Sequence, residues 1–199
     1  MSQALRIAVG DVERETREFL ERRLPRLGHT VVSVAETGRD LVEHCRLHRP
    51  DLVVVGVRQP WAEGLRAVAN LFLDREVPVI ACTERADEGW AEQAFAAGVF
   101  AHLFKPVTER EVGPAIDAAW LRWQQFQTLW QEAADLKQAL EDRKVVERAK
   151  GAVMRRVGVQ EYEAFRRLRK MASDGNLKLV EVARRVLAAE DTFRALDAL

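Results

Sequence analysis

The fold is decided by residues 52–57, which read Leu-Val-Val-Val-Gly-Val. A β-branched run without a polar residue indicates a strand that is buried on both of its faces. The first 119 residues contain four more apolar runs: Leu5–Val9, Val31–Val34, Val77–Cys82 and Ala101–Phe104. Continuous apolar strands are typical of parallel sheets that helices cover on both sides. The sequence therefore predicts a five-stranded parallel sheet.

Helical patterns separate these runs and complete an α/β domain over residues 1–119. They cover about residues 13–23, 38–48, 64–73, 89–97 and 109 onward. Thr108 and Glu111 form a capping-box pattern at the start of the fifth helix. In such a sheet the functional site lies at the carboxyl ends of the strands. Those ends carry Gly10-Asp11, Gly56, Thr83 and Lys105-Pro106.

Charge is distributed unevenly along the chain. Lys plus Arg and Asp plus Glu both number 31, so the formal net charge is zero. Residues 1–119 hold 15 basic and 19 acidic side chains, whereas residues 120–199 hold 16 basic and 12 acidic ones. Between Arg143 and Arg185 the count is 13 basic against 5 acidic. A positive segment of this density predicts a polyanionic partner.

Several classes of protein are disfavoured. No apolar run approaches the roughly 18 residues of a membrane span, and Met1–Gly10 is too quickly polar for a secretion signal. Cys45 and Cys82 make no disulfide framework, which fits a reducing cytoplasm. Motifs of phosphate loops, nucleophile elbows and zinc proteases are absent, so we expect neither an enzyme nor a cofactor. His44 and His48 lack a further ligand, so we favour a solvent-facing helix end there over a metal site.

The residues at the strand ends resemble those of the receiver domain of bacterial response regulators, and so do two further strings, Arg58-Gln59-Pro60 and Glu63-Gly64. The resemblance implies a flavodoxin-like fold. The resemblance implies two acids after the first strand that hold Mg²⁺ and an aspartate at the end of the third strand that accepts a phosphoryl group. It further implies a hydroxyl and a lysine that sense the phosphate. Three of these positions match in this chain: Asp11, Thr83 and Lys105.

Two departures decide the expected chemistry. Gly10 stands in place of the first acid, and Gly56 stands in place of the phosphoacceptor. Glycine has no side-chain oxygen to phosphorylate, and Asp11 alone is a poor donor set for Mg²⁺, which prefers several oxygens in near-octahedral array. We therefore predict a degenerate site in a pseudo-receiver, controlled by a partner protein, such as a sensor, or by a ligand. Asp11, Thr83 and Lys105 are then expected to shape turns and caps.

A helical pattern without a loop signal connects this domain to the C-terminal segment. Between residues 120 and 142 apolar side chains step by three and four, which is the spacing of a coiled coil: Phe126, Leu129, Ala133, Leu136 and Leu140. Trp123 and Trp130 lie one position off this seam. The pattern predicts a homodimer. The alternative is a helix that packs on its own receiver-like domain.

Residues 143–199 predict a small bundle of three helices. One helix ends at Gly158, a second covers residues 161–173, and a third covers residues 179–189. Cationic side chains lie on the polar faces of the first two helices: Arg143, Lys150, Arg166, Arg169 and Lys170. Such a face supplies phosphate contacts, although a merely solvated surface has the same composition.

Two strings carry a second resemblance. Residues 140–154, Leu-Glu-Asp-Arg-Lys-Val-Val-Glu-Arg-Ala-Lys-Gly-Ala-Val-Met, and Glu163–Arg169 resemble the ANTAR module, named for antitermination regulators of amidase and nitrate operons. The match continues through Leu179–Ala183. The resemblance implies binding to paired hairpins in leader mRNA, which prevents a terminator from forming. It implies RNA contacts by Arg143, Lys150 and Arg169, while Arg166 and Lys170 add attraction for phosphate.

Two functions remain open from the sequence. The first is a cytoplasmic RNA-binding antiterminator whose two hairpins call for two copies of the module. The second is a protein-interaction module of a signalling pathway that binds no nucleic acid. A DNA-binding regulator is a weaker third reading, because the last two helices resemble a helix-turn-helix. Tyr162, the single tyrosine, either stacks on a base or packs at the start of its helix, and the sequence favours packing.

Overall fold

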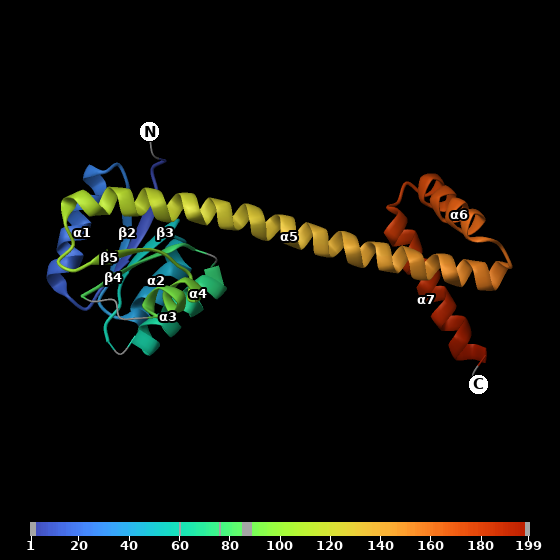
Figure 1. The fold of residues 1–199 in the computed structure, drawn as a ribbon, viewed down its shortest axis with the longest axis horizontal. Helices are drawn as coiled ribbons and strands as arrows, with labels where there is room; N and C mark the ends of the chain where they lie inside the picture. Colours follow the sequence, from blue (N-terminus) through green and yellow to red (C-terminus); the bar gives the residue numbers. More distant parts are fainter. Residues whose placement is uncertain (1–2, 60, 76, 85–88, 198–199) are drawn as a thin grey trace. The chain divides into compact units, whose positions relative to one another are not determined.

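The computed structural model describes residues 3–59, 61–75, 77–84 and 89–197. Its N-terminal part is a five-stranded sheet in the order β2-β1-β3-β4-β5, and every neighbouring pair is parallel (Figure 1). The strands are β1 (Arg6–Gly10), β2 (Thr30–Ala35), β3 (Leu52–Gly56), β4 (Val79–Thr83) and β5 (Val99–Phe104). This architecture confirms the predicted flavodoxin-like sheet.

Helices cover both faces of the sheet, as Figure 1 shows. One face carries α1 (Arg14–Arg26) and the first part of α5 (Glu109–Val157), and the other carries α2 (Gly38–His48), α3 (Trp61–Arg75) and α4 (Trp90–Ala96). Each face has its own apolar cluster. α1 extends past the predicted end at residue 23, because Leu24 is fully buried and continues the apolar stripe that includes Leu20.

The side chains of β3 alternate between the two clusters. Val53 and Val55 pack with α2 and α3, whereas Leu52 and Val54 pack with α1 and α5. Successive side chains of a strand point to opposite faces, so a strand covered on both sides is apolar at every position. This requirement is the physical reason for the uninterrupted run that predicted the strand.

The capping box at the start of α5 is present in part. The Glu111 carboxylate accepts the backbone N–H of Thr108 at 3.1 Å and its hydroxyl at 2.6 Å. Glu111 thus fixes the residue that precedes the helix, as the box predicts. The Thr108 hydroxyl itself donates to Glu111 in place of accepting a backbone N–H.

α5 is one helix of 49 residues that takes part in two compact units, residues 1–127 and 128–199. The predicted divisions at 119/120 and 142/143 both lie inside this helix, and they stay predictions. In the first unit, Phe126 packs on the rings of Phe100 and Trp123, with ring centroids 5.8 Å apart in both pairs. The sequence predicts Phe126 in the dimer seam, but in the structure its ring closes the apolar cluster of the first unit.

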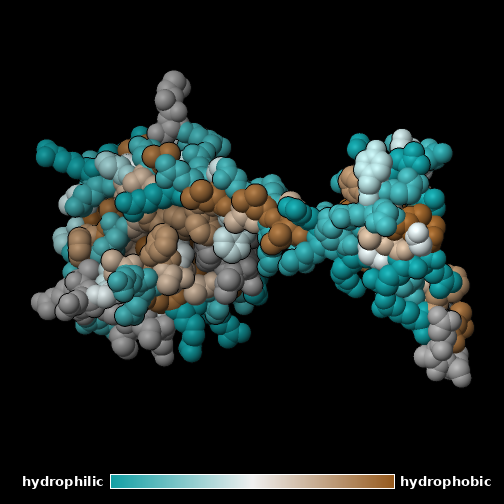
Figure 2. All heavy atoms as spheres, turned by 45° about the vertical axis from the view of Figure 1, so that its right-hand side comes forward, coloured by the Kyte–Doolittle hydropathy of each residue, from teal (hydrophilic) through white to brown (hydrophobic). Residues whose placement is uncertain are grey.

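Beyond Phe126 the predicted seam is open. The exposed fractions of Leu129, Leu136 and Leu140 are 65%, 72% and 56%, and Ala133 is exposed as well. Figure 2 shows hydrophobic side chains along α5 beside the N-terminal unit. The described chain thus presents a strip of leucines on α5.

The second unit is a bundle formed by the end of α5, α6 (Glu161–Asp174) and α7 (Leu179–Asp197). Its core contains Ala149, Leu168, Ala172, Val182 and Ala183. α7 continues eight residues past the predicted end at residue 189. Within the described part of the chain, no helix combines the length and the apolarity that a bilayer crossing needs.

Candidate functional site

The predicted receiver site lies at the carboxyl edge of the sheet, where β1, β3 and β4 end and β5 leads to Lys105. Gly10 and Gly56 occupy the positions expected to carry carboxylates. A Cβ atom on Gly56 would collide with the carboxylate of Asp11, and one on Gly10 would lie 2.6 Å from Leu41 Cδ2. The space of both absent side chains is therefore filled by residues of this chain. Pro60 and the side chain of Glu63, from the other motifs of the resemblance, lie outside the described residues.

Asp11 and Lys105 form a buried ion pair at this edge. Their side chains are 1% and 6% exposed, and Lys105 Nζ lies 2.7 Å from Asp11 Oδ2. Lys105 Nζ also lies 3.1 Å from Glu13 Oε2, and the other oxygen of Glu13 is 3.7 Å from Arg58. Asp11 Oδ1 accepts the backbone N–H of Glu13 at 2.9 Å. The cation that senses phosphate in a working receiver is here neutralised by two carboxylates of the same chain.

Lys105 helps to keep the Glu13 carboxyl ionised. Partial burial acts to raise the pKa of the Glu13 carboxyl, but the hydrogen bond and the charge of Lys105, together with smaller effects of Thr16 and Arg58, outweigh it, so the pKa is lowered. Glu13 thus stays ionised in the network. The donor set does not suit Mg²⁺, because Gly10 and Gly56 offer no side-chain oxygen and Lys105 occupies the carboxylates that are present.

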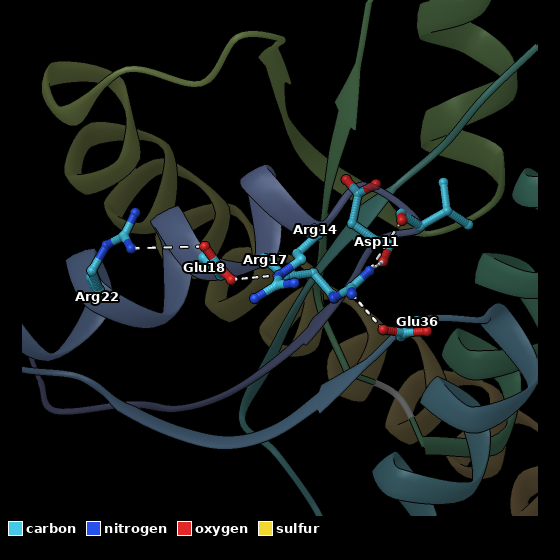
Figure 3. A network of polar contacts seen from close by, with 7 residues as sticks. Asp11, Arg14, Arg17, Glu18, Arg22 and Glu36 are labelled. Atoms are coloured by element: carbon cyan, nitrogen blue, oxygen red, sulfur yellow. Dashed lines mark hydrogen bonds and ion pairs between the residues drawn. The ribbon is translucent and has the colours of Figure 1, made fainter.

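Arg17 fixes the backbone of the same loop (Figure 3). Its guanidinium donates to the carbonyl oxygens of Asp11 at 2.6 Å and Val12 at 3.1 Å, and it pairs with Glu36 at 2.5 Å. The Arg17 side chain is 10% exposed, so these bonds replace its lost hydration. The sequence alone does not indicate that Glu13, Arg17 and Glu36 belong to this network. Their identity depends on the path of the loop after β1, which no motif specifies.

Thr83 is fully buried, and its hydroxyl lies 2.6 Å from Nε2 of His102 on the neighbouring strand β5. The pairing of β4 with β5 brings these two side chains together. Burial lowers the pKa of His102. Burial and the nearby Asp11 charge raise the pKa of the Cys82 thiol to about 12. The thiol therefore stays protonated and is no nucleophile.

A pocket of about 380 Å³ opens beside this edge. Its described lining combines an apolar floor, which includes Leu41, Val55 and Val68, with Arg58 and Gln59. Gly10, Gly38, Gly56 and Gly64 all contribute to its wall. The described residues gather no group of three or more His, Cys, Asp or Glu side chains that suits a metal ion.

The second candidate site is the cationic surface of the C-terminal bundle. Arg143 on α5 and Arg166, Arg169 and Lys170 on α6 are all exposed, as expected. Within the described residues, Arg166 shares Glu163 with Arg167, at 2.8 and 2.9 Å. Arg143, Arg169 and Lys170 form no ion pair with a described residue, so their charges are available to a ligand. We call Arg166, Arg169 and Lys170 the α6 cationic face.

Lys150 differs from the expectation of an exposed phosphate contact. Its side chain is 10% exposed, and its ammonium lies 2.7 Å from Glu147 and 2.6 Å from Glu161, the first residue of α6. Hydrogen bonds from Glu147 and Glu161 raise the pKa of Lys150. The spacing of Lys150 from Arg143 predicts that Lys150 lies on the polar face of α5. In the structure the first turn of α6 covers its side chain. Lys150 thus joins the start of α6 to α5.

Comparisons with known proteins identify one known domain in each of the two units. The response regulator receiver domain matches residues 7–117, and the ANTAR domain matches residues 134–187. The transcriptional regulatory protein PdtaR of Mycobacterium tuberculosis H37Rv is 34% identical over 182 residues, which are 92% of this chain and 89% of PdtaR. The chain belongs to the ANTAR-domain response regulators. Both matched domains are regulatory in this family.

Other comparisons cover smaller parts of this ANTAR-domain response regulator. The nitrate regulatory protein of Klebsiella oxytoca is 44% identical over 70 residues, 35% of this chain and 18% of that protein. The signal receiver domain of a diguanylate cyclase from Desulfovibrio desulfuricans superposes with a TM-score of 0.55 at 24% identity, covering 61% of this chain and 98% of that one. The receiver domain of the response regulator NarL from Mycobacterium tuberculosis gives 0.52 at 25%, with coverages of 58% and 94%. These two structures support the receiver fold.

Proposed function

We propose that this protein is an RNA-binding transcription antitermination regulator that acts on hairpins in leader mRNA. The observation that carries the proposal is the position of the α6 cationic face, whose exposed side chains lie within the segment that matches the ANTAR domain. The identity of 44% to the nitrate regulatory protein, which is named for a regulatory role, supports it. Folded RNA presents closely spaced phosphates and unpaired loop bases, which suit an exposed cationic helix.

We infer that two copies of the chain act together. The strip on α5, Leu129, Ala133, Leu136 and Leu140, leaves a heptad-spaced apolar face exposed. A parallel pair of such helices covers the strip and carries one bundle on each chain. Two linked modules bind two hairpins with an avidity that one module lacks.

We infer further that phosphotransfer does not control this protein. Asp11 fills the space over Gly56, and Lys105 is neutralised by Asp11 and Glu13, so neither the acceptor nor the sensing cation is offered to a phosphodonor. Control falls to a partner protein or a small ligand, for which the pocket beside Gly56 offers volume. Incubation with a small phosphodonor followed by mass spectrometry tests this: a covalent phosphoryl adduct on the N-terminal unit would refute it.

Electrophoretic mobility shift with leader RNA hairpins and with duplex DNA of equal length tests the RNA-binding function. We expect a shift with the hairpins at low ionic strength that weakens as salt rises, because bound phosphates release counterions. A preference for duplex DNA would indicate a DNA-binding regulator. Binding of neither nucleic acid would favour the protein-interaction module, since the exposed leucines of α5 serve assembly in either case.

A further inference from the structure

Tyr162 lies on the exposed side of α6, outside the core of the bundle. Its side chain is 79% exposed, and it makes no hydrogen bond or ring contact with a described residue. The core of the second unit contains the neighbouring Ala164 on the same helix but not Tyr162. The packing role that the sequence favoured for Tyr162 is therefore wrong. Its phenol ring contributes little to the stability of the bundle.

The neighbours of this ring are cationic. Residues four and seven positions apart lie on one side of a helix, so Tyr162 shares its side of α6 with Arg166 and Arg169. Tyr162 acts electrostatically on Arg166, and together with the larger effect of Glu163 it raises the pKa of that guanidinium. The ion pairs of Glu163 with Arg166 and Arg167 are exposed, which makes them weak enough to exchange for a phosphate.

The first turn of α6 is held firmly despite its exposure. Glu161 precedes Tyr162 and forms the 2.6 Å ion pair with Lys150, and the Lys150 ammonium also lies 5.9 Å from the centre of the Phe165 ring. The backbone at Tyr162 is therefore held between anchored residues of the same helix. An ordered backbone has little conformational entropy left to lose when a flat partner stacks on the ring.

We propose that Tyr162 is a base-stacking residue, which receives one unpaired base of an RNA hairpin loop while Arg166 and Arg169 contact the adjoining phosphates. This inference rests on the proposed RNA-binding function and assigns within it the residue that distinguishes a loop from a paired stem. A paired base already stacks on its neighbours, so only an unpaired base gains from an exposed aromatic ring. Stacking accepts any base, because every base has a π-face. Tyr162 thus selects unpaired structure, and the cations supply general affinity.

The test measures how tightly the full chain binds each of two RNA probes. One is an RNA hairpin with a loop of unpaired adenosines, one of which is replaced by 2-aminopurine, and the other is a blunt RNA duplex with the sequence of its stem. We expect Tyr162→Ala to weaken hairpin binding by about tenfold and to remove the fluorescence quenching of 2-aminopurine. Duplex affinity and salt dependence should not change. Tyr162→Phe keeps the ring and should bind the hairpin as the wild-type chain does.

Met171→Ala is the matched control, because Met171 is also exposed on α6 (56%) but lies on a different side of the helix. It should leave both affinities unchanged. Hairpin affinity that is equal in Tyr162→Ala and the wild type overturns the stacking role while leaving the RNA-binding function intact. If the wild-type chain binds neither probe at low ionic strength, the RNA-binding function itself is overturned and the stacking role with it. Circular dichroism of each variant confirms that the helices are folded.

Discussion

Gly56 matters at the residue scale because of what lies above it. The carboxylate of Asp11 occupies the space that a side chain at position 56 would need. The sequence predicts the loss of phosphotransfer from the absence of an oxygen at this position. It does not predict that the Asp11 carboxylate lies over Gly56 and pairs with Lys105, since that depends on the conformation of the loop after β1.

Gly56→Ala should therefore destabilise the protein, although it adds only a methyl group. The new Cβ must displace Asp11 from its buried pair with Lys105, and we expect a loss of about 1–3 kcal/mol in the free energy of unfolding. Urea unfolding at neutral pH measures this loss. Gly151→Ala is the control: the nearest atom is the flexible end of Arg155 at 3.4 Å, so a helix-interior alanine should stabilise by about 0.5–1 kcal/mol. A Gly56→Ala protein as stable as the wild type would contradict the packing described.

Lys105→Met should make stability less sensitive to acid. Because Lys105 lowers the pKa of Glu13 in the folded chain, its contribution is complete above the unfolded pKa of about 4.3 and is lost as the pH falls through the lower folded value. The stability gap between wild type and Lys105→Met should thus be large at pH 7 and shrink below about pH 4. Urea midpoints at both pH values measure it. Lys137→Met, at an exposed position of α5, should show no such gap; an equal gap for Lys105→Met at both pH values argues against the pair.

At the scale of elements, periodicity predicts the helices and strands well and predicts burial poorly where elements meet. The runs of β1, β3 and β4 are unambiguous because both of their faces are covered. Phe126 and Lys150 show the limit. Each lies on one continuous helix, and only the arrival of another element decides its burial: the Phe100 ring covers Phe126 and the start of α6 covers Lys150.

The structure separates the roles of Lys150 and Arg169. Lys150→Gln should lower the melting temperature, because it leaves Glu147 and Glu161 without their cation at the junction of α5 and α6. Arg169→Ala should leave the melting temperature unchanged. It should also reduce the slope of log affinity for RNA hairpins against log salt by about 0.7–0.9, the value of one phosphate contact. Thermal unfolding and salt titration measure the two effects; a Lys150→Gln protein that melts normally but binds with a reduced slope would reverse the assignment.

At the scale of the whole molecule, the family resemblance from sequence supplies what no single residue shows. The two matched domains, at residues 7–117 and 134–187, were both recognisable from short strings, because strand ends and helix faces keep their spacing. The dimer is a proposal at this scale, and it depends on the leucines of α5.

Leu129→Glu together with Leu136→Glu should convert the dimer into a monomer. The new carboxylates would face like charges of the second copy, and such pairs cannot be buried in a coiled-coil seam. An RNA with two hairpins should then lose its advantage over a single hairpin, whereas the single hairpin should bind unchanged. Sedimentation velocity and RNA titration measure these outcomes. Leu47→Glu, at a 75% exposed position of α2, is the control. A double variant that stays dimeric would place the interface elsewhere.

The filled space over Gly56 also bears on redesign. An aspartate introduced alone at position 56 would meet the Asp11 carboxylate, and one introduced alone at position 10 would meet Leu41. A carboxylate therefore cannot be added at either position unless a neighbouring side chain moves. Any attempt to engineer a phosphorylatable version of this edge has to begin with residues 11 and 41.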